Sequence, residues 1–177
     1  MTAKVSLQAL QQHLFAIPDT TTYAILDGAS SPDLLPALDR WVVESVCLFR
    51  GELEPDLALM APYLTVVQPN TPFAEWLLQE GWGKHWGIFV ISKAGFRDLR
   101  QHFRSFIKVY GPDGKPLYFR YYDPRVLRAY LPTCNPQEAR TVFGPVLRYI
   151  AEDEDPSVLL KFWPESNQVK SERVSLT

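Results

Sequence analysis

The sequence predicts an α/β fold in which a mixed sheet is flanked by helices. Over the first half of the chain, β-branched apolar segments alternate with segments of helical periodicity. In the second half, Gly111-Pro112-Asp113-Gly114 lies between two extended arms and signals a hairpin. Of the 177 residues, 46% are hydrophobic and 13% aromatic, enough to bury a sizeable core. We expect one domain over residues 1–163, with room for two closely packed lobes meeting near residue 70, and a flexible polar tail over 164–177.

Two helix signals open the first half of the chain. Leucines at helical spacing predict an amphipathic helix over residues 4–16. Ser31, Pro32 and Asp33 then combine a capping hydroxyl, a proline suited to the first helical position and an acid suited to the positive end of the helix dipole. The strands expected in this half are the apolar segments 21–28, 44–49, 63–67 and 85–92.

Later helices carry equally local signals. Thr71 is placed to cap a helix that Gly81 ends, and a further helix is expected over residues 95–106. Asn135 before a proline begins another. The closing strands expected are "VLRYIAED" and "SVLLKFW", around an acidic turn.

The segment "LYFRYYD", residues 117–123, is predicted to continue the hairpin as a strand covered on both faces, because bulky side chains alternate along it. Arg120 would then be partly buried and would need an anion or a carbonyl as partner. Asp123 has the character of a helix N-cap, with Pro124 at the first helical position. Arg125 opposes the helix dipole by roughly 0.3–1 kcal/mol, so we expect a carboxylate, an aromatic face or another molecule to offset it.

Composition excludes several function classes. A formal net charge of −2 does not suit a dedicated nucleic-acid binder. No apolar run is long enough to cross a bilayer, and the amino terminus lacks the apolar block of a signal peptide. Cys47 and Cys134 have no CxxC spacing and are expected to be separate thiols in a reducing compartment. We therefore expect a cytoplasmic protein without cofactor or metal, bound to neither nucleic acid nor membrane.

Enzymatic signatures are missing from the sequence. It contains no GxSxG elbow, glycine-rich phosphate loop, HExxH motif or Cys/His metal spacing. Asp27 at a strand end, Ser30 after it and His85 beside a glycine-flanked turn leave open a small hydrolase or transferase. The alternative is that Asp27 and Ser30 only satisfy backbone groups in their turn. We expect no catalytic residue.

Two further patterns suit a protein partner. Arg97, Arg100 and Arg104, with Lys108, fall within an arc of about 60° on the helix over 95–106. This stripe would suit an acidic partner, or it is a solvated face.

Two tryptophans lie at the glycine-flanked turn beside His85. Trp82 lies between glycines, and Trp86 follows four residues later. They would act either as interface anchors or as a packed lid over the core.

The ordered motifs "LFRGEL" (48–53), "APYL" (61–64), "WGIFVIS" (86–92), "PDGKPLYFRYYDPRVLRAYLP" (112–132) and "FGPV" (143–146) resemble the type VI secretion effector adaptors. These Tap/Tec-type bacterial chaperones are catalogued as a domain of unknown function. The resemblance spans residues 23–163. It implies a non-enzymatic adaptor that binds a toxic effector in the producing cell and helps to load it onto the VgrG/PAAR spike. An immunity protein that occludes a toxin active site is the alternative.

The residues expected to contact a partner combine this resemblance with the patterns above. They are Arg50, Trp82, Trp86, Arg97, Arg100, Arg104, Arg120, Tyr122 and Arg125. The motif positions expected to be structural are Gly51, Gly87, Asp123 and Pro124.

Overall fold

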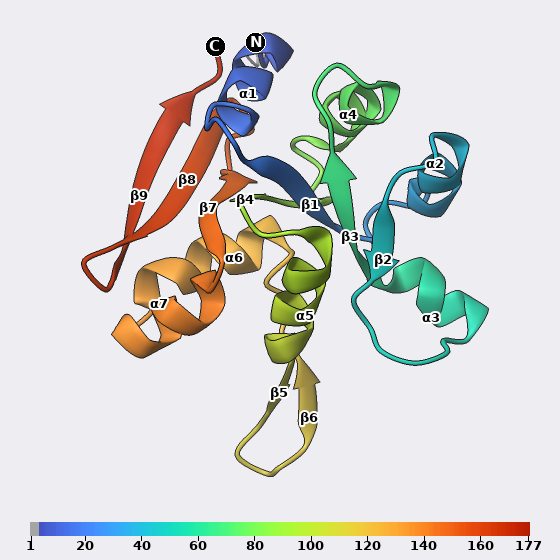
Figure 1. Ribbon diagram of the computed structural model, residues 1–177, viewed down its shortest axis with the longest axis vertical. Coiled ribbons are helices and arrows are strands. Elements are labelled where there is room, and N and C mark those ends of the chain that lie inside the picture. Colours follow the sequence, from blue (N-terminus) through green and yellow to red (C-terminus); the bar gives the residue numbers. More distant parts are fainter. Residues whose placement is uncertain (1–3) are drawn as a thin grey trace.

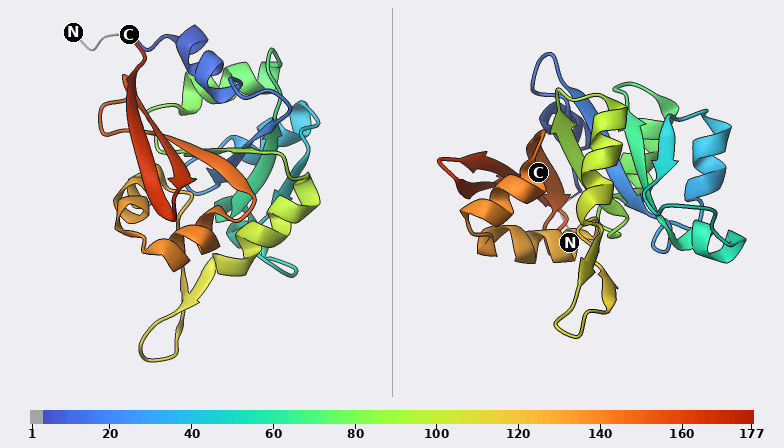
Figure 2. Two further views of the ribbon diagram at one scale, coloured as in Figure 1. Left: turned by 60° about the vertical axis from the view of Figure 1, so that its left-hand side comes forward. Right: turned by 60° about the horizontal axis from the view of Figure 1, so that its bottom comes forward.

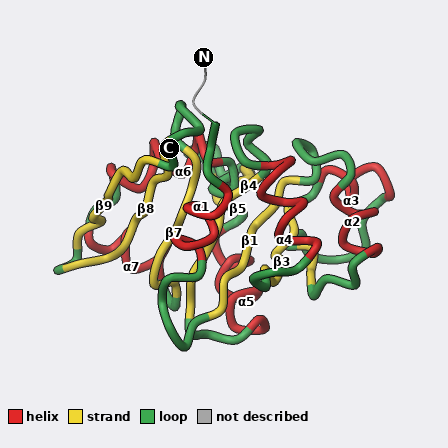
Figure 3. Tube along the Cα trace, turned by 90° about the horizontal axis from the view of Figure 1, so that it is seen from above, coloured by secondary structure: helices red, strands yellow, loops and turns green. Residues whose placement is uncertain are grey.

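The structure, a computed structural model, describes residues 4–177. A seven-stranded sheet forms its centre, and a separate two-stranded hairpin projects beyond the sheet (Figure 1). The strands of the large sheet are β1 (Thr21–Asp27), β2 (Ser45–Cys47), β3 (Pro62–Val67), β4 (Gly87–Ser92), β7 (Val146–Glu152), β8 (Val158–Glu165) and β9 (Gln168–Ser175); those of the hairpin are β5 (Lys108–Tyr110) and β6 (Pro116–Tyr118). The sheet order is β2-β3-β1-β4-β7-β8-β9, and Figure 3 shows this succession from β9 to β3.

Helices flank the sheet, which confirms the predicted α/β fold. They are α1 (Leu7–Leu14), α2 (Leu34–Arg40), α3 (Pro55–Met60), α4 (Pro72–Trp76), α5 (Phe96–Phe106), α6 (Pro124–Tyr130) and α7 (Pro136–Phe143). A π-helical turn, Leu77–Gly81, extends α4, and a 3₁₀ turn, Leu131–Thr133, extends α6.

Each face of the sheet has its own hydrophobic core. Side chains alternate along the central strand β1, so Tyr23 and Ile25 join one core and Ala24 and Leu26 join the other. The first core is closed by α5, α6 and α7, and the second by α1, α2 and α4. Because β1 is covered on both faces, its sequence is an almost continuous apolar run.

The described strand pairs are all antiparallel, although strands and helices alternate over the first half. β1 pairs with β3 on one side and with β4 on the other, so the sheet continues across residue 70. The hairpin β5–β6 forms its own small sheet and does not join the large one.

The expected flexible tail over residues 164–177 is wrong. β9 pairs with β8 along its whole length, and Leu176 is only 1% exposed. The amide of Ser6 donates to the carbonyl of Leu176 at 2.8 Å, which ties the described amino-terminal segment to the carboxy-terminal one. The sequence of β9 reads as polar because it is an edge strand, where charged side chains are common.

The expected strand over 117–123 is also wrong beyond residue 118. β6 ends at Tyr118, and the chain then turns at Tyr121 and Tyr122, where the amide of Asp123 donates to the carbonyl of Arg120 at 3.0 Å and both tyrosines are buried. The chain turns inward because Tyr121 packs between Phe103 and Phe106, with ring centroids 5.8 and 4.7 Å away, and its hydroxyl donates to the carbonyl of Phe103 at 3.0 Å.

Three of the four predicted helix caps are confirmed. The hydroxyl of Thr71 accepts from the amide of Ala74, Asp123 caps α6, and Asn135 forms a capping box with Glu138. The Ser31 cap is wrong: its hydroxyl is buried without a partner, and only its carbonyl accepts from the amide of Leu34.

Candidate functional site

The arginine-bearing turn before α6 is held together by its own acids. Asp123 accepts from the amide of Arg125 at 2.9 Å, and the Arg125 guanidinium folds back to donate from Nε to Oδ1 at 3.0 Å and from Nη2 to Oδ2 at 2.8 Å. The unfavourable interaction of Arg125 with the dipole of α6 is therefore offset by Asp123, which also caps that helix. Pro124 occupies the first helical position, as predicted.

Arg120 finds its partner at the end of β1. Its Nη2 donates to Oδ2 of Asp27 at 2.8 Å, and Asp27 is only 2% exposed. Asp27 also accepts from the amide of Ala29 at 3.1 Å and from the hydroxyl of Ser30 at 2.9 Å. We expected Tyr122 at a partner surface, but it is 3% exposed and lies beneath the guanidinium of Arg120, 6.0 Å from ring centroid to Cζ.

Charge pairing keeps this corner ionised. Burial alone would raise the pKa of Asp123, but the hydrogen bonds and charge of Arg125 bring the pKa below its ordinary value. Burial alone would lower the pKa of the Arg120 guanidinium. The charge and the hydrogen bond of Asp27 outweigh the effect of burial, so this pKa lies above its ordinary value. Arg120 and Arg125 thus form ion pairs within the protein. Contact of these two arginines with a partner stays a prediction.

The loop between the π-helical turn and β4 wraps around a buried carboxylate. Glu152, at the end of β7, accepts from the amides of Gly83 at 2.5 Å and His85 at 3.0 Å. The Nδ1 atom of His85 lies 2.6 Å from Oε1 of Glu152. Burial raises the pKa of Glu152, and the two amides and His85 oppose that rise.

The two tryptophans of this loop form a packed lid. The indole of Trp82 donates to the carbonyl of Pro156 at 2.7 Å, and Trp86 packs against Trp76 with ring centroids 5.1 Å apart and the ring planes tilted by 47°. Both rings are half-buried and pack against the second core. This packing agrees with the alternative of a lid over the core, and contact of Trp82 and Trp86 with a partner stays a prediction.

Of the three residues considered for a hydrolase, Ser30 and Asp27 contact each other, and His85 forms no hydrogen bond or ion pair with either of them. Ser30 donates to Asp27, which is already paired with Arg120, whereas His85 faces Glu152. The cavity beside Glu152 measures about 10 Å³. The interpretation of Asp27 and Ser30 as turn residues agrees with this geometry.

The basic stripe of α5 meets the hairpin and the loop after β2. Arg97 is exposed, while Arg100 and Arg104 are half-buried, and Arg104 donates from Nη2 to the carbonyl of Cys47 at 2.6 Å. A groove of about 400 Å³ opens here. Its lining includes Phe49, Arg50, Arg104, Lys108, Tyr110 and Tyr118.

The two predicted structural glycines have clear geometric reasons. Gly51 has φ +85°, a left-handed conformation that lets the chain turn back beside the groove. At Gly87, a Cβ atom would lie 2.1 Å from the carbonyl oxygen of Ile25, so only glycine lets β4 approach β1 closely.

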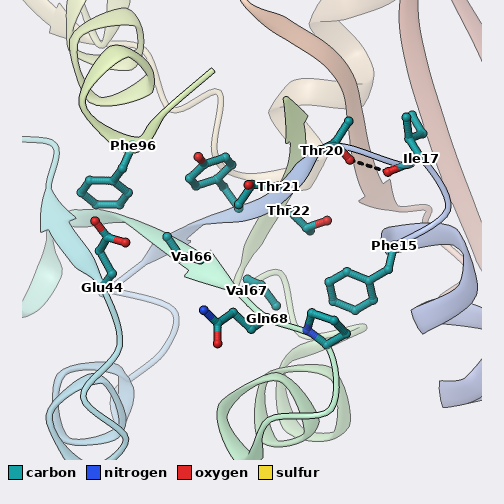
Figure 4. Close-up of a pocket in the computed structure, with 12 residues that line it drawn as sticks. Phe15, Ile17, Thr20, Thr21, Thr22, Glu44, Val66, Val67, Gln68 and Phe96 are labelled. Atoms are coloured by element: carbon teal, nitrogen blue, oxygen red, sulfur yellow. Dashed lines mark hydrogen bonds between the residues drawn. The ribbon is translucent and has the colours of Figure 1, made fainter. Parts of the chain in front are cut away.

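A larger cavity of about 610 Å³ lies at the opposite end of β1 from Asp27 (Figure 4). Its lining includes Phe15, Thr21, Glu44, Gln68 and Phe96. The sequence does not predict this cavity, because the residues that line it come from separate segments and share no motif. None of the predicted partner-binding residues lines it.

Metal-ligand clusters and membrane-spanning helices are both absent from residues 4–177. Within residues 4–177, no group of three or more His, Cys, Asp or Glu side chains is placed to hold a metal ion. No described helix has the length and apolarity to cross a membrane.

Comparison with known proteins gives one match. Residues 22–141 match the profile of the DUF4123 family, described as a domain of unknown function. Searches of curated proteins and of solved structures returned no match. The matched segment runs from β1 into α7 and so contains the arginine-bearing turn, the basic stripe and the hairpin. Since it covers more than half of the sequence, the chain belongs to the DUF4123 family.

Proposed function

We propose that the protein is an adaptor of type VI secretion. In this proposal it binds a toxic effector in the cytoplasm of the producing cell and promotes loading of that effector onto the VgrG/PAAR spike. Membership of the DUF4123 family carries the proposal, together with the motif "FRYYDPRVL" through which the sequence resembles Tap/Tec-type adaptors.

The geometry supports polypeptide binding in a specific way. The hairpin exposes apolar side chains beside guanidinium groups that no acid of the described chain pairs. Such a surface can cover an apolar segment of a client and set its register through charge pairing. The adaptor would thereby shield the client until it is handed to the spike.

A non-catalytic role is part of the proposal. Ser30 donates to Asp27, Asp27 is paired with Arg120, and His85 lies against Glu152, so no nucleophile lies against a free base among these three. Substitution of Asp27 or His85 is expected to affect folding or loop geometry and no turnover reaction.

The test is co-expression with the product of a neighbouring effector gene. We expect the two proteins to co-purify at low salt, and deletion of the adaptor gene to abolish effector delivery while the producing cell stays healthy. Absence of co-purification would contradict the proposal. Self-intoxication after deletion would instead identify an immunity protein.

A further inference from the structure

The hairpin β5–β6 carries apolar side chains that the rest of the described structure leaves exposed. All six residues of its strands are exposed, including Val109, Tyr110 and Leu117, and Tyr110 is 70% exposed. Figure 2 shows the hairpin standing away from the body of the molecule. A two-stranded hairpin gains little stability by itself, and contiguous exposed apolar side chains mark interaction surfaces.

The loop after β2 forms the second wall of a groove at the base of this hairpin. The ring of Phe49 lies 4.6 Å from the ring of Tyr118, which joins the loop to the hairpin. The hairpin is tied to α5 by the amide of Phe119, which donates to the carbonyl of Ile107 at 2.8 Å. The groove between these walls, about 400 Å³, is therefore built by three segments that brace one another.

Positive charge accumulates in the groove without internal compensation. Arg50, Arg104 and Lys108 line it, and no carboxylate within residues 4–177 forms an ion pair with any of the three. Glu52 and Glu54, on the same loop as Arg50, are among the acids that make no such pair. Burial lowers the pKa of Arg104, and the neighbouring charges of Arg100 and Arg50 lower it further. Crowded cations of this kind are stabilised when an anion arrives.

We infer that this groove, bounded by loop 48–53, the end of α5 and the hairpin, docks an acidic segment of the client polypeptide that also carries apolar side chains. Client carboxylates pair with Arg50 and Arg104, and an apolar side chain of the client packs on the surface formed by Phe49, Tyr110 and Tyr118. The inference rests on the proposed adaptor function and adds the place and the chemistry of client recognition. Charge complementarity selects the acidic segment, and the exposed apolar residues select a polypeptide.

The test uses short fluorescent peptides as probes and fluorescence anisotropy of the full chain as the readout. One peptide alternates glutamate with phenylalanine, a second lysine with phenylalanine, and a third glutamate with serine. We expect binding of the first alone, weakened about tenfold or more by Arg50→Glu and by Tyr110→Ser. Arg140→Glu, on α7, is the matched control and is expected to bind as the unmodified protein does, because its side chain is exposed, does not line the groove and donates to Oδ1 of Asn167.

Several results would overturn the inference. Equal binding of the lysine peptide, or full binding by both groove variants, would remove the groove as an acidic docking site. Binding of single-stranded DNA in competition with the first peptide, at lower concentration, would make nucleic acid the better ligand, since aromatic and basic side chains also suit that polymer. Circular dichroism of each variant confirms that it is folded.

Failure of the inference is separable from failure of the proposed function. If the effector co-purifies equally with the unmodified protein and with Arg50→Glu, the adaptor function stands and the groove is wrong. If the peptides bind as expected but no neighbouring effector co-purifies, the groove remains a docking site for acidic segments. The proposed role in type VI secretion is then wrong.

Discussion

Arginines occupy two regions of this protein under opposite conditions. At the turn before α6, Arg120 and Arg125 each donate to a buried carboxylate of the same chain. In the groove beside the hairpin, Arg50 and Arg104 have no acidic partner within the described chain. The first two arginines are neutralised by carboxylates of the protein, whereas no described carboxylate neutralises the second two, of which Arg104 also donates to the carbonyl of Cys47. Sequence motifs do not separate these roles, because the same residue type carries both.

The largest expected effect on stability comes from removing Asp27, the carboxylate at the end of β1 that accepts from Arg120. Asp27→Ala leaves Arg120 unpaired and removes the acceptor of two local hydrogen bonds, so we expect a loss of about 2–3 kcal/mol in the free energy of unfolding. Urea denaturation measures it. Asp113→Ala, at the exposed hairpin tip, is the control and should change stability by less than about 0.5 kcal/mol. Equal losses of unfolding free energy in the two variants would contradict the claim that the Arg120–Asp27 pair stabilises the fold.

A smaller effect is expected when only the charge of the α6 cap is removed. Asp123→Asn keeps a capping side chain but weakens the pairing with half-exposed Arg125, so we expect a loss of about 1 kcal/mol at neutral pH. The folded-state pKa of Asp123 lies below its ordinary value of 3.8, so the charge stabilises the fold above that value. This contribution is lost as the pH falls through the lower folded value.

The measurement is therefore the difference in unfolding free energy between the unmodified protein and Asp123→Asn at neutral and acid pH. We expect that difference to shrink as the pH falls below about 4, where the aspartate becomes protonated in the unfolded chain first. A difference that does not depend on pH would mean that the Arg125 pair contributes nothing.

The smallest effect on stability is expected in the groove. Arg50→Glu and Tyr110→Ser alter exposed side chains without ion pairs among the described residues, so each should change the free energy of unfolding by less than about 0.5 kcal/mol. Thermal or urea unfolding checks this. A loss as large as that of Asp27→Ala would show that the groove is structural, and the contrast between the two regions would disappear.

Local features of the fold could be predicted from the sequence, and distant pairings could not. The caps Thr71, Asp123 and Asn135 act within three residues of themselves, so short motifs identify them. The Arg120–Asp27 pair joins positions 93 residues apart, and only the need for an anion near Arg120 was predictable.

The carboxy-terminal strand was missed because its alternating polar residues match an exposed tail as well as an edge strand. The pairing that defines β9 is supplied by β8, and Leu176 is buried in the second core, among residues from distant segments. For the candidate site, the basic stripe of α5 was predictable from helical spacing. Its junction with Phe49, Arg50 and the hairpin was not, because three separate segments meet there.

Retention of the co-expressed effector by purified groove and control variants tests the central claim most directly. The account predicts that Arg50→Glu loses most of the effector that the unmodified protein retains, while Arg140→Glu retains it fully and both variants unfold at the same urea concentration. Equal retention by Arg50→Glu and Arg140→Glu would contradict the claim that the unpaired arginines of the groove hold the client.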